Sequence, residues 1–213
     1  MKKYLVIMAA TALATSVFAQ GTISMGNLSS TLVKQWTTAG DSTLISAPVA
    51  SAQVQFLAAP TGTSLTPLGT LGAGGFSTSF STLAGFLAAN PGWAAYTTTG
   101  ISPVAGRFGG GVVTVNGIAA GANIEYIVIG WQGATGSTLD SALALGSSFI
   151  GQSALVTGVA TGNPTTIPAG TPSLMNASFG GLTLAPLSSV PEPSTFALAG
   201  LGAAALMIFR RRK

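Results

Sequence analysis

Residues 123–131 read NIEYIVIGW, and this segment is the strongest strand signal in the chain. Successive side chains of a β-strand point to opposite faces, so the segment can be sorted into two sets. The sets are Ile124, Tyr126 and Val128 on one face and Ile127, Ile129 and Trp131 on the other. A strand that is apolar on both faces is typical of a sheet interior with both sides covered. We therefore expect residues 123–131 to form a central strand.

Other segments predict further strands around this one. They are Thr22–Met25, Ala52–Ala58, Val112–Val115, Phe149–Thr157 and Leu182–Ala185. In Ala52–Ala58, Val54 and Phe56 share one face while Gln53 and Gln55 share the other, which is typical of a half-buried strand. These short alternations, separated by Gly and Pro, predict one all-β domain over residues 20–189.

The predicted architecture is a β-sandwich with one or two short helices. Ile118–Val128 resembles the turn into a late strand of fibronectin type III and other immunoglobulin-like sandwiches, with Ala120 where those domains usually carry Pro. A jelly roll fits the pattern equally well. Ser137 is a predicted N-cap of one helix, with Asp140 at its N3 position and Leu139, Leu143 and Ala144 facing inward before Gly146.

A second apolar helical turn is expected in Thr82–Ala89, and residues 163–172 read as a loop. The glycine runs Gly72–Gly75 and Phe108–Gly111 are interpreted as turns, because neither precedes a helix with the Lys and Ser/Thr of a phosphate-binding loop.

Charge is concentrated at the two ends of the chain. The formal net charge is +4, but six of the eight basic residues are Lys2, Lys3 and the final four residues. Residues 20–189 contain Lys34 and Arg107 against Asp41, Glu125 and Asp140, a net charge of −1. Phosphate neutralisation needs clustered Lys or Arg, so nucleic-acid binding by this domain is excluded. The chain has neither Cys nor His, which removes the usual transition-metal ligands and any disulfide framework.

The N-terminus, MKKYLVIMAATALATSVFA, has the three parts of a secretory signal peptide. Lys2 and Lys3 form the positive region, Leu5–Ala14 the apolar region, and Val17 and Ala19 the small residues before a cleavage site. We expect export through the Sec translocon, a signal helix over residues 1–19, and signal peptidase cleavage between Ala19 and Gln20.

The C-terminus, VPEPSTFALAGLGAAALMIFRRRK, predicts a short membrane helix. Its uncharged run from Ser194 to Phe209 would be roughly 24 Å long as a helix. The basic cluster that follows, Arg210, Arg211, Arg212 and Lys213, stays on the cytoplasmic side, so the domain is placed outside. Pro191 and Pro193 hold the acidic Glu192 in an extended segment just before the helix.

Pro191-Glu192-Pro193, the short apolar helix and the basic end, in this order, resemble the PEP-CTERM sorting signal of Gram-negative bacteria. Such a tail also carries the label ice-binding protein C-terminal region, which describes the tail and does not establish ice binding. The resemblance covers about residues 190–213 and implies recognition by an exosortase, a membrane transpeptidase that cuts near the motif. Pro191, Glu192 and Pro193 are then substrate residues, and none is catalytic.

The domain itself offers little for catalysis. Lys34 is its only Lys, so nothing marks a Ser-Lys dyad, and three acidic residues are few for a paired-carboxylate mechanism. Glu125 is interpreted as a solvated carboxylate on a strand. We therefore expect no enzymatic activity and no cofactor. Trp36, Trp93 and Trp131 can each stack on sugar rings or pack in the core; core packing is favoured for each, and Trp93 is the best exposed candidate for glycan stacking.

The predicted organisation is a signal peptide over residues 1–19, a β-rich extracytoplasmic domain over 20–189 and a sorting signal over 190–213. The precursor is expected to be membrane-anchored with a cytoplasmic C-terminus, and the mature domain periplasmic, at the cell surface or extracellular. The resemblance implies a non-enzymatic surface or matrix protein associated with exopolysaccharide. The alternative is a module that binds carbohydrate or, less favoured, ice, because Thr97, Thr98 and Thr99 alternate faces and form no regular array.

Overall fold

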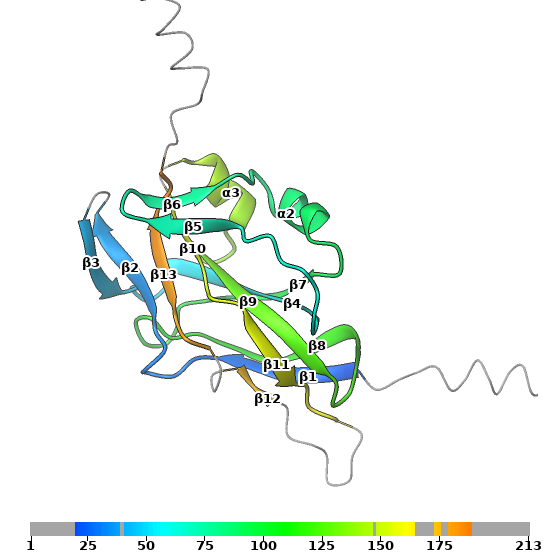
Figure 1. Cartoon of the computed structure of the whole chain (residues 1–213). Coiled ribbons are helices and arrows are strands. Elements are labelled where there is room, and N and C mark those ends of the chain that lie inside the picture. The colour runs from blue at the N-terminus through cyan, green and yellow to red at the C-terminus, as the bar shows by residue number, and fades with distance from the viewer. Residues whose placement is uncertain (1–19, 39–40, 147, 165–172, 176–178, 189–213) are drawn as a thin grey trace, which may run out of the picture.

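A computed structural model describes residues 20–38, 41–146, 148–164, 173–175 and 179–188 (Figure 1). Its strands are β1 (Gln20–Gly26), β2 (Val33–Thr38), β3 (Asp41–Ser46), β4 (Ala52–Pro60), β5 (Gly69–Gly72), β6 (Gly75–Thr78), β7 (Ala94–Gly100), β8 (Gly109–Ala119), β9 (Asn123–Gln132), β10 (Phe149–Gln152), β11 (Val156–Ala160), β12 (Ser173–Leu174) and β13 (Leu182–Pro186). Its helices are α2 (Leu83–Ala89) and α3 (Leu139–Ala144). The mostly β content confirms the predicted all-β class.

Strand β9 lies inside the largest sheet, as its two apolar faces predict. The order of this sheet is β3-β2-β13-β10-β9-β4-β7, with β11 also paired to β9. All residues of β9 between its first and last are buried. Its antiparallel pairing with β4 runs from Ala52 opposite Gln132 to Pro60 opposite Ile124.

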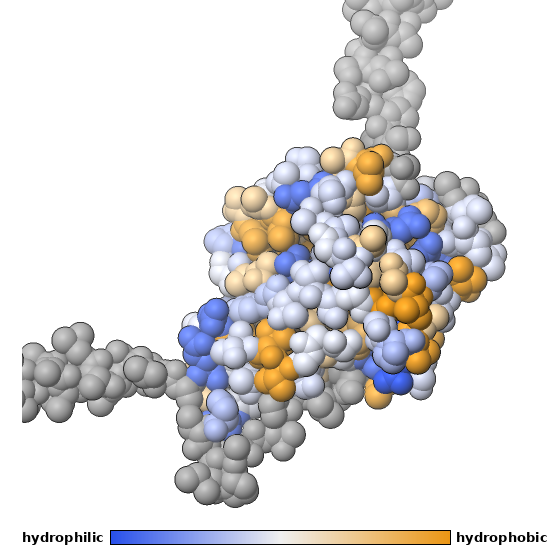
Figure 2. Space-filling model, turned by 180° about the vertical axis from the view of Figure 1, so that it is seen from behind, coloured by the Kyte–Doolittle hydropathy of each residue, from blue (hydrophilic) through white to orange (hydrophobic). Residues whose placement is uncertain are grey.

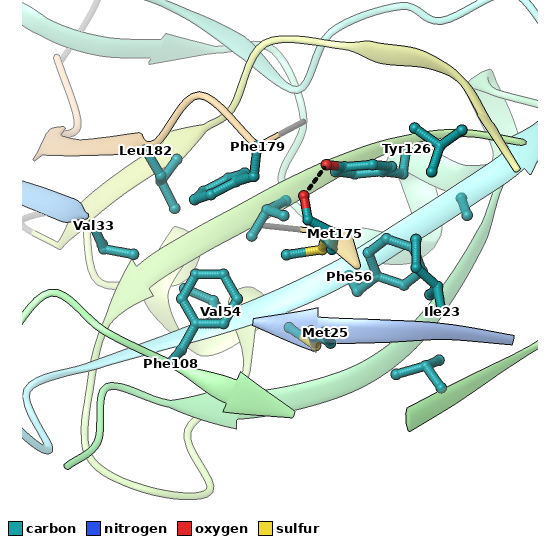
Figure 3. Packing of buried hydrophobic residues seen from close by; sticks show 14 of the residues in the cluster. Ile23, Met25, Val33, Val54, Phe56, Phe108, Tyr126, Met175, Phe179 and Leu182 are labelled. Carbon is teal, nitrogen blue, oxygen red and sulfur yellow. Dashed lines mark hydrogen bonds between the residues drawn. The ribbon is translucent and has the colours of Figure 1, made fainter. Parts of the chain in front are cut away.

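The two faces of β9 belong to two separate hydrophobic cores. Ile124, Tyr126 and Val128 lie in a core closed by the second sheet, β12-β1-β8 (Figure 3). Ile127, Ile129 and Trp131 lie in a core on the opposite face, together with residues of α2, α3 and the β5-β6 hairpin. The molecule is therefore a β-sandwich with an additional outer layer of two short helices and a hairpin (Figure 1).

Two pairings in the sandwich are parallel, β13 with β2 and β1 with β12. The immunoglobulin-like and jelly-roll topologies considered from the sequence are built from antiparallel sheets, so this mixed order departs from both. The strand predictions over residues 22–25, 112–115 and 182–185 are confirmed by β1, β8 and β13. The predicted strand over 149–157 is two strands, β10 and β11, with a break at residues 153–155. The Ser153 N–H still donates to the Val128 carbonyl at 2.9 Å, whereas the Val128 N–H donates to the Ser153 hydroxyl at 2.9 Å, and the ladder is interrupted there.

The prediction that Ala52–Ala58 is half-buried is wrong. Strand β4 lies between β9 and β7, and Gln53 is only 3% exposed. The alternation of Gln and apolar residues resembles an exposed face, but the outer layer covers the glutamine side as well.

The predicted helices are present, with a different start for one of them. Helix α2 matches the turn expected in 82–89, and Thr82 is its N-cap. The N-cap of α3 is Thr138 and not Ser137, because Thr138 forms a capping box with Ser141. Leu139 and Ala142 are the buried residues of α3, whereas Ala144, which was expected to face inward, is exposed.

The turn prediction is confirmed for one of the two glycine runs and wrong for the other. Gly72 pairs with Gly75 across a tight hairpin turn between β5 and β6, as predicted. Gly109–Gly111 instead begins strand β8, and the turn prediction there is wrong. The predicted signal peptide and sorting region lie outside the described residues, as does most of the predicted loop over 163–172. Within the described ranges, no helix combines the length and apolar character needed to cross a membrane.

Tyr126 gives the fold a predicted response to alkaline pH. Its hydroxyl donates a hydrogen bond to the Met175 carbonyl at 2.9 Å inside the first core (Figure 3). Burial raises the pKa of Tyr126, because the phenolate is poorly solvated there. A raised pKa contributes stability that is present below pH ~10, the unfolded value, and is lost as the pH rises above it.

We expect the melting temperature to fall above pH ~10, and to fall less steeply in Tyr126→Phe, which has no ionisable group at this position. Differential scanning calorimetry from pH 7 to 11 measures both. Equal slopes in the two proteins would contradict this prediction.

Candidate functional site

An open groove of about 860 Å³ lies on the described surface. Its floor includes Lys34 of β2 and Thr183 of β13, which pair with each other across the sheet. The β5-β6 hairpin and residues 62–67 form one wall. Hydroxyl groups of Ser30, Ser64 and Ser153 also line it.

The lining is mixed in character, and no acidic residue contributes to it within the described ranges. Lys34 is exposed. Leu44, Leu71 and Leu155 add apolar surface, and each is between 42% and 49% exposed. Figure 2 shows that, on the face it views, hydrophobic residues form separate patches and not one continuous area. The groove therefore combines one cation, several hydroxyls and scattered leucines.

The wall segment Gly62–Leu68 is anchored by four side chains from separate parts of the fold. Glu125 of β9 accepts the Gly62 N–H at 3.2 Å, and the Trp93 indole donates to the Ser64 carbonyl at 3.1 Å. Asn90 accepts the Thr66 N–H, and Gln152 of β10 accepts the Leu68 N–H, each at 2.6 Å. Because every anchor bonds to the backbone, the wall is held in one position whatever its own side chains are.

Trp93 is therefore not exposed as the sequence indicated. It is 6% exposed and packs in the second core, and its N–H is used by the wall. Trp36 and Trp131 are 4% and 1% exposed. Within the described ranges no aromatic side chain is exposed. The buried Trp93 ring therefore offers no platform for a sugar, and the glycan-stacking role assigned to it has no structural support.

Glu125 also differs from its interpretation as a solvated carboxylate. It is 3% exposed, and its Oε1 has no hydrogen-bond partner, while Oε2 holds Gly62. Strand β9 is interior, so the side chains between its first and last residues do not reach solvent on either face.

We predict that Glu125→Gln raises the free energy of unfolding by about 1 kcal/mol, because a neutral amide is cheaper to bury and can still accept the Gly62 N–H. Urea denaturation at pH 7 measures the change, with Gln152→Glu as the reverse exchange at a second wall anchor. A loss of more than about 1 kcal/mol in Glu125→Gln would show that the carboxylate charge itself is required.

Two other ionisable side chains, Asp140 and Arg107, also have structural partners. The Asp140 carboxylate accepts the Leu83 N–H at 2.6 Å and so joins α3 to the first turn of α2. The Arg107 guanidinium donates to the Asn27 carbonyl at 3.0 Å. Within the described residues, no three His, Cys, Asp or Glu side chains gather in a cluster that could hold a metal ion.

Comparison with known families gives a match at the C-terminus of the chain. Residues 189–213 match the family model of the PEP-CTERM protein-sorting motif. The chain therefore carries the sorting signal that its sequence predicted, and this signal marks an exported protein that an exosortase processes and that its C-terminal tail anchors to the membrane. No curated protein and no solved structure matches the chain.

Sequence reasoning missed the groove and its four anchors. Three of the anchoring side chains are Asn90, Gln152 and Glu125, which are common surface residues, and no local pattern distinguishes them from solvated ones. One feature of the sequence could have predicted that Glu125 is buried. Glu125 lies within residues 123–131, the strand that is apolar on both faces.

Proposed function

We propose that the domain is a non-enzymatic surface or extracellular-matrix protein that an exosortase releases or re-anchors after export. The observation that carries the proposal is the sorting motif at residues 189–213, which begins shortly after β13, the last strand of the described residues. In this proposal, Pro191, Glu192 and Pro193 are read by the exosortase, and Arg210–Lys213 stop transfer across the membrane.

The use of ionisable groups supports a structural role. Asp140, Arg107 and Glu125 each bond to a backbone group that joins two elements of the fold. A general acid or base must instead reach a substrate in a cleft, and none of these three residues lines the groove. Asp140 borders a separate hollow of about 340 Å³, but its carboxylate already accepts the Leu83 N–H there.

Association with exopolysaccharide is the finer part of the proposal, and the groove is where we place it. Hydroxyl-lined surfaces bind sugars through hydrogen bonds, and Lys34 favours an acidic sugar. We expect Lys34→Ala to weaken retention of the mature protein on acidic polysaccharide beads, and Val112→Ala, at an exposed site on β8, to leave it unchanged. Equal retention of both variants and the unmodified protein would contradict a role for the groove.

Cell fractionation combined with mass spectrometry tests the sorting proposal. In cells with an exosortase, we expect the surface or extracellular fraction to contain a chain that begins at Gln20 and lacks Arg210–Lys213. In cells without the enzyme, the chain should keep its tail and stay in the membrane fraction. A soluble cytosolic chain that retains both Met1 and Lys213 would refute the proposal.

A further inference from the structure

The described chain ends at Ser188, beside a surface that carries an exposed leucine. After β13, the Leu187 N–H bonds to the Ser148 carbonyl, and the Ser188 N–H bonds to the Phe76 carbonyl, each at 3.0 Å. The C-terminal end of the domain is therefore fixed between the segment that follows α3 and strand β6. It lies at the top of Figure 1, beside these two elements.

Leu145 lies beside this exit point. It is the C-cap of α3, three residues before Ser148, and is 70% exposed. Leu71 is not part of this face, because it lies directly opposite the buried Phe76 in the β5-β6 hairpin and lines the groove. Figure 2 shows a hydrophobic patch at the top of the molecule, where the described chain ends.

The length of the tether limits which surface can meet the membrane. Only residues 189–193 separate Ser188 from the predicted start of the membrane helix at Ser194. Five residues and their flanking bonds span at most about 20 Å when fully extended. A domain of this size is about 40 Å across, so the tether is shorter than the domain is wide.

We propose that, in the membrane-anchored precursor, the face around the exit point rests on the lipid bilayer surface, with Leu145 in the interfacial region. This inference rests on the membrane anchoring in the proposed function and adds the orientation of the domain. Leu145 is the most exposed large hydrophobic residue of the described chain, and a leucine in the interface removes its apolar area from water. The charged Asp140 does not cover Leu145. Asp140 is in the first turn of α3, where it accepts the Leu83 N–H, whereas Leu145 is at the opposite end of α3.

Depth-dependent fluorescence quenching tests the orientation directly. The chain has no cysteine, so Leu145→Cys in the full-length precursor gives a single labelling site for an environment-sensitive dye. The control is Val112→Cys, because Val112 is 62% exposed and lies on β8 of the second sheet, away from the helical layer. Both proteins are reconstituted into phosphatidylcholine vesicles that contain brominated acyl chains.

We expect quenching at position 145 to exceed that at position 112 by about threefold or more, with a blue-shifted emission at 145 only. Equal quenching at both positions in a vesicle-bound precursor would overturn the inference while leaving the membrane anchor intact. A precursor that fails to co-float with the vesicles would overturn the anchor itself, and with it this inference. Ala144→Cys, at the exposed position before Leu145, provides a second reading of the same face if labelling at position 145 unfolds α3.

Discussion

Trp131→Ala is expected to lower the free energy of unfolding by about 4 kcal/mol. The Trp131 ring is 1% exposed and lies in the second core, between Gln53 of β4 and Ile150 of β10, its neighbours across the sheet. Truncation removes the largest fully buried side chain of the described residues and leaves a cavity that interior strands cannot close by moving together. It also leaves the Ser137 hydroxyl without the indole N–H that it accepts at 3.1 Å.

Guanidinium denaturation of the secreted form measures this loss, and two matched variants divide it into its parts. Ser137→Ala removes only the hydrogen bond and should cost about 1 kcal/mol. Leu145→Ala, at a 70% exposed position, should change the free energy of unfolding by less than about 0.5 kcal/mol. If Trp131→Ala costs no more than Ser137→Ala, the ring does not support the second core as described.

The role of Trp131 could be predicted because the information is local. Residues 123–131 carry apolar side chains on both faces, and this alternation requires cover on both sides wherever the strand lies. The two cores found on the two faces of β9 confirm that requirement. The sorting tail could be predicted from the sequence for the same reason, because its motif, apolar run and basic end are contiguous.

The features that sequence reasoning missed depend on contacts between distant segments. Gln53 alternates with apolar residues as an exposed glutamine would, yet it is 3% exposed and lies between Gly100 of β7 and Trp131 of β9. The groove draws its lining from segments as far apart as residues 30–34 and 180–183, which meet because β13 pairs in parallel with β2. Trp93 follows an Asn-Pro-Gly sequence that predicts a loop, yet its ring is buried beneath the groove wall.

Asn27 is the strongest case of such a long-range contact, and Asn27→Leu is expected to cost about 3 kcal/mol of unfolding free energy. Asn27 is 3% exposed. Its amide donates to the Thr31 and Gly106 carbonyls at 2.8 and 2.9 Å, and its side-chain oxygen accepts the Phe108 N–H at 2.8 Å. One side chain therefore joins the loop after β1 to the segment that leads into β8.

Leucine has the same number and branching of side-chain heavy atoms as asparagine and a larger volume, so the expected loss comes from lost hydrogen bonds and crowding and not from a cavity. The Gly106 carbonyl keeps the Val33 N–H as a second partner at 2.8 Å, but the buried Phe108 N–H loses its only partner in the described structure. An unpaired buried donor costs about 1–3 kcal/mol, and the lost bonds to the two carbonyls add to this.

The control for this prediction is Asn116→Leu, the same exchange at an exposed position of β8, where the change should stay within about 0.5 kcal/mol. Hydrogen exchange of the Phe108 amide adds a local measurement, because this proton should exchange much faster in Asn27→Leu than in the control. Equal stability of the two variants, with unchanged protection at Phe108, would mean that Asn27 does not hold these segments together. The order of β1 against β8 would then depend on their ladder and on the first core alone.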